Sequence, residues 1–121
     1  MRLFFTLGCV SAGLGVGLGA FAAHGLRNLL TEADLATFEV GVRYQVYHAF
    51  ALLAVAWAIE RWGSQTAVWA GWAFVLGIVV FSGSLYLLVL TGPRWLGAVT
   101  PIGGVALLVG WLLLAWTALR S

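Results

Sequence analysis

The side chains that could do chemistry are few, and they fall in four short stretches of a very apolar sequence. The candidates that can hydrogen-bond or bind a ligand are His24, Tyr44, Gln45, His48, Ser82, Ser84, Tyr86 and Thr100. Tyr44, Gln45 and His48 are spaced so that a helix would carry all three on one face. This pattern suggests either a polar pocket that holds a ligand or a set of hydrogen bonds between helices.

Metal binding and catalysis are the first chemistries to weigh. His24 and His48, with Glu39 as a third group, could be metal ligands, but the sequence has no HxxxH or HExxH spacing and a single cysteine. Ser82 or Ser84 could pair with His48 as nucleophile and base, yet no acid lies in the same stretch and no nucleophile-elbow motif surrounds either serine. We therefore expect no metal, no cofactor and no enzymatic activity.

Composition dictates the elements that must position these groups. Hydrophobic residues make up 63% of the 121 residues and charged residues only 8%, whereas a soluble domain has about 45–50% apolar and about 25% charged residues. Because so few charged side chains cannot cover a water-exposed surface, most of the surface of the protein must contact lipid. The net charge of +2 is too small to indicate a nucleic-acid partner.

Four apolar runs are predicted to cross a membrane as helices, because backbone polar groups find no water to bond in hydrocarbon. The predicted spans cover residues 3–23, 44–59, 67–90 and 102–119. The first run is longer than the apolar region of a cleavable signal peptide, so we expect it to remain as a span. The sequence thus predicts an all-α membrane protein, a single integral membrane domain over residues 1–121 that folds as a four-transmembrane-helix bundle.

The long connection between the first two spans is predicted to be helical as well. Thr31 and Asp34 have the spacing of a capping box. Leu35, Phe38 and Val42 then recur at helical spacing, with charged residues between them. We interpret this segment as a short amphipathic helix at the membrane surface that continues into the second span.

Four glycines in the first span form two GxxxG pairs. Gly13 pairs with Gly17, and Gly15 pairs with Gly19, on two sides of the predicted helix. Glycines let helix backbones approach closely in membranes, so we expect the first span to be central and packed on both glycine faces. Packing within the chain is favoured over contact with another subunit, because four spans must first cover their own small-residue faces.

The numbers of basic residues on the two sides of the membrane favour neither orientation. The side that holds both termini carries Arg2, Arg61 and Arg120, and the opposite side carries Arg27, Arg43 and Arg94. The positive-inside count is therefore a tie, and the terminal amine beside Arg2 favours cytoplasmic termini. We expect membrane lipids as partners, and a second copy of the chain or another membrane protein as the partner in any assembly.

Four motifs follow one another along the chain and carry a family resemblance. They are GAFAAHGL (Gly19–Leu26), YQVYHAFALL (Tyr44–Leu53), FSGSLYLLVLTG (Phe81–Gly92) and TPIGGVALLVGW (Thr100–Trp111). In order and spacing they resemble the YgdD/YwdK-like family of small four-helix bacterial inner-membrane proteins, a domain of unknown function with relatives among small eukaryotic transmembrane proteins. The family's GAFGAHGL has glycine where this chain has Ala22, and its YQxxH matches Tyr44 to His48. The resemblance implies a fold and a bacterial inner-membrane location, but no reaction.

Two functional hypotheses remain. In the first, the chain is non-enzymatic and is structural or accessory to a membrane assembly, because it lacks catalytic groupings and intramembrane charge. In the second, the polar cluster on the side opposite the termini binds or transports a small ligand, a lipid or an ion. A cavity among these side chains would favour the second hypothesis.

His48 is the residue for which the sequence gives the most detailed expectation. We expect it at about the level of the headgroups, facing the bundle. The groups expected to satisfy its nitrogens are His24, Ser82, Ser84, Tyr86 and Thr100. Trp111 is interpreted as a packing residue.

Overall fold

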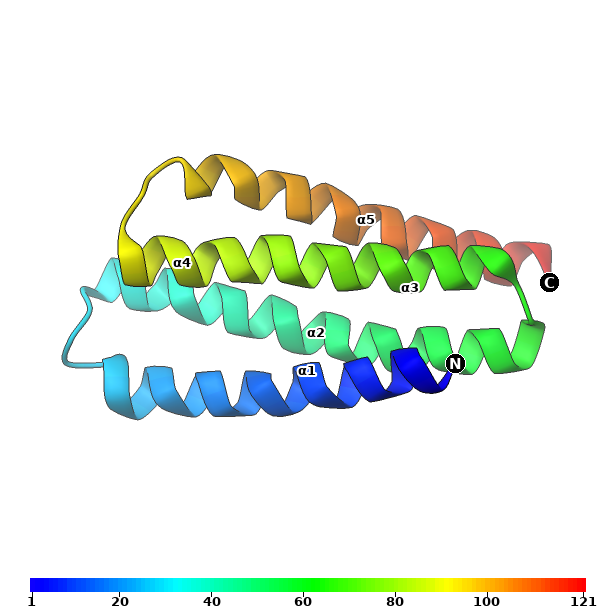
Figure 1. Ribbon diagram of the computed structural model, residues 1–121, viewed down its shortest axis with the longest axis horizontal. Helices are drawn as coiled ribbons and strands as arrows, with labels where there is room; N and C mark the ends of the chain where they lie inside the picture. Colours follow the sequence, from blue (N-terminus) through cyan, green and yellow to red (C-terminus); the bar gives the residue numbers. More distant parts are fainter.

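The computed structural model describes residues 1–121, which form a bundle of long helices without strands (Figure 1). The elements are α1 (Arg2–Phe21), η1 (Ala22–Leu26), α2 (Glu32–Trp62), α3 (Gln65–Gly77), η2 (Ile78–Ser82), α4 (Gly83–Thr91) and α5 (Leu96–Arg120), where η marks a π-helical segment. Because η1 extends α1 and η2 joins α3 to α4, the chain makes four continuous rods, each long and apolar enough to cross a membrane. The predicted all-α membrane bundle of four helices is confirmed.

The order of the rods differs from the expectation that the first span is central. In Figure 1, α1 lies along one edge beside α2, the α3–η2–α4 rod follows, and α5 lies along the other edge. α2 contacts every other rod, whereas α1 packs mainly on α2. Both termini lie at the end of the bundle that holds the α2–α3 turn (Figure 1). The central helix is therefore α2, the one that carries Tyr44, Gln45 and His48.

Local sequence signals explain where the helices begin and end. The Thr31 hydroxyl accepts a hydrogen bond from the Asp34 backbone N–H at 3.1 Å, which caps the start of α2. Gly63 ends α2 in the left-handed conformation, with φ of 61°, and Gly92 ends α4 with φ of 92°. Glycine adopts these positive φ values without steric cost, so both turns can reverse the chain in a few residues.

The amphipathic segment before the second span is not a separate surface helix. It forms the first turns of α2, which runs unbroken from Glu32 to Trp62. Phe38 is 0% exposed and packs against Ala22 and Leu26, so this segment packs against the bundle. At about 1.5 Å per residue α2 is about 46 Å long, longer than the hydrocarbon core of about 30 Å. Its charged first turns therefore extend beyond the hydrocarbon without leaving the helix axis.

The fourth span also begins earlier than predicted. α5 starts at Leu96, so Pro101 lies inside the helix. The backbone N–H groups of Leu96, Gly97 and Ala98 bond carbonyls three residues earlier, and these tight turns start the helix ahead of the proline.

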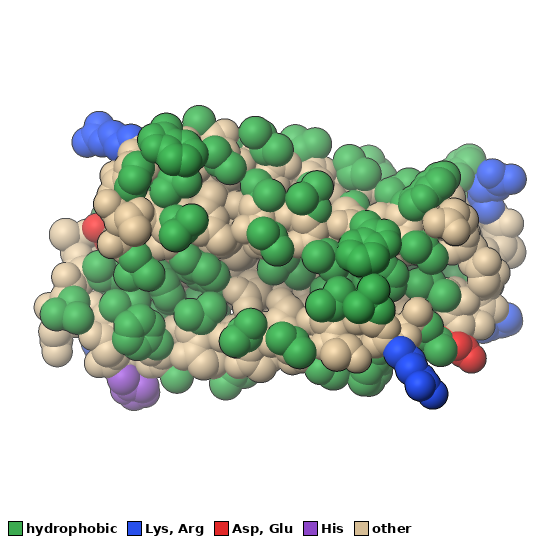
Figure 2. Space-filling model, viewed as in Figure 1, with side chains coloured by type: hydrophobic (Ala, Val, Ile, Leu, Met, Phe, Trp, Pro, Cys, Tyr) green, Lys and Arg blue, Asp and Glu red, His purple; other side chains and the backbone are tan.

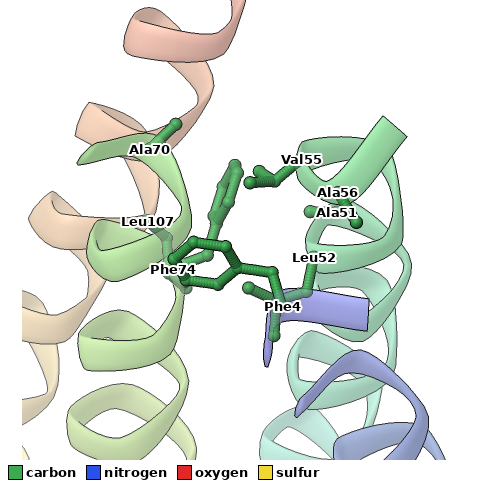
Figure 3. Close-up of a cluster of buried hydrophobic side chains, with 8 residues drawn as sticks. All are labelled: Phe4, Ala51, Leu52, Val55, Ala56, Ala70, Phe74 and Leu107. Carbon is green, nitrogen blue, oxygen red and sulfur yellow. The ribbon is translucent and has the colours of Figure 1, made fainter. Parts of the chain in front are cut away.

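Apolar side chains fill the centre and also cover the outside. The main core cluster joins Phe4 of α1, Leu52 and Val55 of α2, Phe74 of α3 and Leu107 of α5, with small alanines between them (Figure 3). The visible face of the molecule is mostly hydrophobic, and charged side chains gather toward its two ends (Figure 2). This distribution suits a bundle whose middle contacts lipid and whose ends contact water.

Only one of the two glycine pairs of α1 packs against protein. A Cβ added to Gly15 would lie 2.5 Å from Val46 Cγ2, and one added to Gly19 would lie 3.4 Å from Val42 Cγ1. Gly13 and Gly17 have no atom within 4 Å of such a Cβ, so the packing expected on their side is absent. A helix at the edge of a bundle has one protein-facing side, which is why a single small-residue face suffices.

Candidate functional site

The predicted polar cluster is divided in the structure into three groups of hydrogen bonds around α2 and α4. One group joins Gln45 to Tyr86, a second joins His48 to Trp111, and a third joins Ser84 to Thr100. His24 belongs to none of them, because it lies in η1 with its side chain exposed. The π-helical turn at the end of α1 belongs to the edge helix, and this places His24 away from the other seven residues.

Both ring nitrogens of His48 are satisfied. Its Nδ1 lies 2.6 Å from the Tyr44 carbonyl oxygen, and its Nε2 accepts the indole N–H of Trp111 at 3.0 Å. Because an indole N–H can only donate and a carbonyl can only accept, the neutral ring carries its proton on Nδ1. The pair ties α2 to α5, and no lone pair of the ring is left for a metal or a substrate.

The expected partners of His48 are therefore wrong. None of His24, Ser82, Ser84, Tyr86 and Thr100 bonds its ring. At about 1.5 Å per residue, His48 lies about 24 Å from the start of α2 and about 21 Å from its end, near the middle of that helix. The indole of Trp111, which the sequence suggested was only a packing group, is the donor that reaches His48.

Ser84 and Thr100 form a second link between helices. Their hydroxyl oxygens are 2.5 Å apart, and each hydroxyl also lies within bonding distance of a carbonyl of its own helix, Phe81 for Ser84 and Leu96 for Thr100. These bonds join α4 to α5 and leave no free nucleophile at Ser84.

The Gln45 group lies about 60° around α2 from His48, where α2 faces α1. The Gln45 amide donates from Nε2 to the Ser11 carbonyl at 2.9 Å, and its Oε1 accepts the Tyr86 hydroxyl at 2.7 Å. Nearby, the Ser82 hydroxyl donates to the Gly41 carbonyl at 2.7 Å. Gln45 thus holds three rods together: α1, α2 and the rod that contains α4.

A cavity opens beside these bonds, and we call it the lateral cleft. It has a volume of about 390 Å³ and lies between α1, α2 and the α3–η2–α4 rod. Its apolar walls include Leu7, Val10, Leu14, Leu18, Val75 and Val79, and its polar groups are Ser11, Gln45, Ser82 and Tyr86. Val10, Leu14 and Val79 are largely exposed, so the cleft opens to the side of the bundle, where lipid lies.

One hydroxyl in the cleft has no partner. Ser11 Oγ is buried, yet no hydrogen-bonding group of the protein lies within reach. A buried polar atom without a partner costs about 1–3 kcal/mol, and such atoms are rare in folded proteins. Ser11 lines the lateral cleft, so the cleft borders a hydroxyl that has no partner in the protein.

Local sequence explains why the cleft forms here. η2 contributes Ile78, Val79 and Ser82 to its wall, and a π-helical turn changes the direction of side chains relative to a regular helix. Gly83 follows directly, and a Cβ there would have no atom within 4 Å. A wide turn followed by a residue without a side chain leaves the space unfilled.

Two participants were missed by sequence reasoning, Ser11 and Trp111. Ser11 was one small polar residue in an apolar span, a signal that could have been read as a functional group in lipid. Trp111 carried no such signal, because its role depends on how α5 is rotated toward α2.

Comparison with known proteins identifies the family. A family model described as a protein of unknown function (DUF423) matches residues 18–104. A UPF0382 membrane protein of Staphylococcus saprophyticus is 49% identical over 114 residues, covering 94% of each chain. The UPF0382 membrane protein YwdK of Bacillus subtilis is 43% identical and covers 99% of this chain and 98% of its own length. The chain belongs to this family.

The DUF423 family match confirms the resemblance found in the sequence motifs. Its members are named as membrane proteins, in agreement with the four apolar rods. Their names carry no activity, so DUF423 membership identifies an integral membrane protein whose biochemical activity is unknown. No solved structure gives a significant match to the chain.

Proposed function

We propose that this protein is a non-enzymatic membrane protein that binds a neutral, largely apolar membrane molecule in the lateral cleft. The observation that carries the proposal is the unpartnered Ser11 hydroxyl inside a cavity of about 390 Å³ that opens toward lipid. Ligand cavities commonly measure about 300–1,000 Å³ and combine apolar walls with a few polar groups. The cavity favours the ligand-binding hypothesis over a purely structural role.

The hydrogen bonds of the polar groups support a non-enzymatic role. A serine nucleophile needs a base within hydrogen-bond reach, but the two nitrogens of His48 are taken by Tyr44 and Trp111. The Ser82 hydroxyl donates to a backbone carbonyl of α2. The groups that could act as base and nucleophile are thus used to join helices.

The donors in the cleft indicate the chemistry of the ligand. The Ser11 hydroxyl is free to donate, and the Gln45 amide has a second N–H beyond the one bonded to the Ser11 carbonyl. Both groups suit a carbonyl or hydroxyl oxygen. No charged side chain lines the cleft, so nothing in it would pair with a charged headgroup. The ligand is therefore an isoprenoid-like or acyl molecule with a neutral oxygen group.

The proposed location is the bacterial inner membrane, with both termini in the cytoplasm. The family resemblance supports the membrane, and the terminal amine beside Arg2 supports the orientation. Since three arginines lie on each side, the preference is small. Labelling of single cysteines placed at Gly63 and Gly97 in intact cells would test it, because only Gly97 should react from outside.

The proposal is tested by filling the cleft. Gly83→Leu should place a side chain in the cleft without a clash, and Gly13→Leu is the matched control because Gly13 is equally open but does not line the cleft. Native mass spectrometry of each protein, purified in mild detergent, would detect a co-purified molecule. We expect a bound apolar species in the wild type and Gly13→Leu, and its loss in Gly83→Leu.

Two results would contradict the proposal. One is a wild-type protein without any co-purified species and with no thermal stabilisation by a membrane lipid extract. The other is a bound species that Gly83→Leu retains as fully as Gly13→Leu. Either result would return preference to a structural or accessory role in a membrane assembly.

A further inference from the structure

The end of the bundle that holds both termini contains a second, polar hollow, which we call the terminal hollow. It measures about 450 Å³, and its lining includes Arg61, Arg120, Ser64, Thr66 and Thr117. These residues come from the end of α2, the start of α3 and the last turns of α5. The hollow therefore lies where three rods reach the water-facing edge of the membrane, far along the bundle from the lateral cleft.

Three hydroxyls of the hollow form a continuous chain. Ser64 Oγ and Thr66 Oγ1 are 2.6 Å apart, and Thr66 Oγ1 and Thr117 Oγ1 are also 2.6 Å apart. In the structure the Thr117 hydroxyl, at the inner end of this chain, donates to the Leu113 carbonyl at 2.8 Å. If the chain runs the other way, from Thr117 to Thr66 to Ser64, the Ser64 proton is free to point into the hollow.

Two arginines line the hollow, and no acidic side chain does. Arg61 is exposed at the end of α2, and Arg120 lies over the Trp116 ring at 5.5 Å. The hydrogen bonds that link lining residues join hydroxyl and backbone groups, and none uses a guanidinium. Glu60, the acidic residue next to Arg61, is exposed and does not line the hollow. Both guanidinium groups therefore keep their donors available.

We propose that the terminal hollow binds the phosphate group of an anionic membrane lipid. Guanidinium groups bind phosphate through paired, charge-assisted hydrogen bonds, and basic pockets between membrane helices at this level suit lipid headgroups. When the hydroxyl chain reverses, the Ser64 hydroxyl would supply a further donor for the same oxygens. The apolar side chains around the bundle would receive the acyl chains, which favours a lipid over free phosphate.

The experiment compares lipids of different charge on the intact protein. The protein is placed in nanodiscs that contain phosphatidylcholine with or without phosphatidylglycerol, and lipid retention after detergent extraction is measured by native mass spectrometry. We expect preferential retention of phosphatidylglycerol. Arg61→Gln and Arg120→Gln should each weaken that preference about tenfold, because each removes charge-assisted hydrogen bonds. Ser64→Ala should weaken it less.

The control is the pair of exposed arginines at the other end of the bundle. Arg27→Gln and Arg94→Gln, made singly, each change the net charge by as much as each test variant without touching the hollow, so retention should stay at the wild-type level. Equal retention of the two lipids by the wild type would overturn the proposal, as would an equal loss in the control. Displacement of the lipid by millimolar inorganic phosphate would assign the site to free phosphate and overturn the lipid assignment.

Discussion

The two sides of the central helix α2 differ in how completely they are filled. Toward α5 and the rod that contains α3, the polar groups are satisfied and the helices interlock. Toward α1, Gly8 and Gly15 pack closely on Ala49 and Val46, but the same helix also borders an open cleft and a hydroxyl without a partner. Since one helix supplies both sides, the difference comes from the residues that face it.

Glycines show the contrast most directly. A Cβ on Gly110 of α5 would lie 2.7 Å from the Phe74 ring, and one on Gly77 of α3 would meet Leu107. On the cleft side Gly83 meets nothing within 4 Å. Ring packing follows the same division, because His48, Phe74 and Trp111 lie with their ring centroids 4.9–5.8 Å apart.

A large space alone does not make a binding site. A groove of about 490 Å³ lies over the α5 side and is lined in part by His48 and Trp111. It is larger than the lateral cleft, yet His48 and the Trp111 indole N–H already have partners within the protein. The polar side chain without a partner is Ser11, which lines the lateral cleft. For this reason the proposed site is assigned to the lateral cleft on its unsatisfied group and not on its volume.

The largest effect on stability is expected from Gly103→Leu, at the contact between α5 and η2. A Cβ at Gly103 would meet the backbone of Phe81, which cannot move aside as a side chain can. Overpacking of this kind should lower the free energy of unfolding by about 3 kcal/mol or more. Unfolding by sodium dodecyl sulfate from mild detergent would measure it. A variant as stable as the wild type would show that the α3–α5 interface is loosely packed.

The next effect is expected from Gly15→Leu at the α1–α2 interface. Its side chain would press on a methyl group of Val46 and not on backbone, so the expected loss is about 1–3 kcal/mol. Gly13→Leu, two residues away on the open side, should leave stability near the wild-type value. Thermal unfolding of the two variants in the same detergent checks the assignment, and equal losses would refute it.

His48→Ala should have a moderate effect. It removes the acceptor of the Trp111 indole N–H and leaves that donor unpaired in an apolar setting. We expect a loss of about 1–2 kcal/mol, since unpaired buried groups cost about 1–3 kcal/mol and hydrogen bonds in membranes average about 0.6 kcal/mol. His48→Gln should recover part of it, because an amide oxygen can accept the same bond. Thermal unfolding with and without added lipid would show an equal loss in both cases.

No loss of stability is expected from Ser11→Ala. The hydroxyl has no partner in the protein, so its removal relieves the cost of an unpaired buried group and should leave the free energy of unfolding unchanged or raise it by up to about 1–3 kcal/mol. Binding of the cleft ligand should weaken in the same variant, as measured by retention in native mass spectrometry. A clear loss of stability without any bound molecule would mean that Ser11 bonds within the protein and is not a ligand group.

More of the fold than of the candidate site could be predicted from the sequence. Hydropathy and length are properties of each segment, so local composition was enough to predict four rods. An even number of rods then places both termini at the same end of the bundle. The cap at Thr31 and the turn at Gly63 were also local signals. The continuation of the amphipathic helix into the second span was predicted as well, and α2 shows it. Its packing on the bundle was not predicted, because a charged amphipathic stretch reads as a surface helix unless its apolar residues are known to be buried, as Phe38 is.

By itself, the sequence determined a membrane protein with four helices and a few polar side chains set among them. The tertiary structure decided which groups meet. Periodicity places Tyr44, Gln45 and His48 near one another on a helix, but it cannot give the rotation of the facing helices about their axes. That rotation brings Trp111 to His48, turns Gly13 outward and leaves the Ser11 hydroxyl alone in the cleft. Helix rotation results from the packing of all four rods at once, so no single segment of the chain contains it.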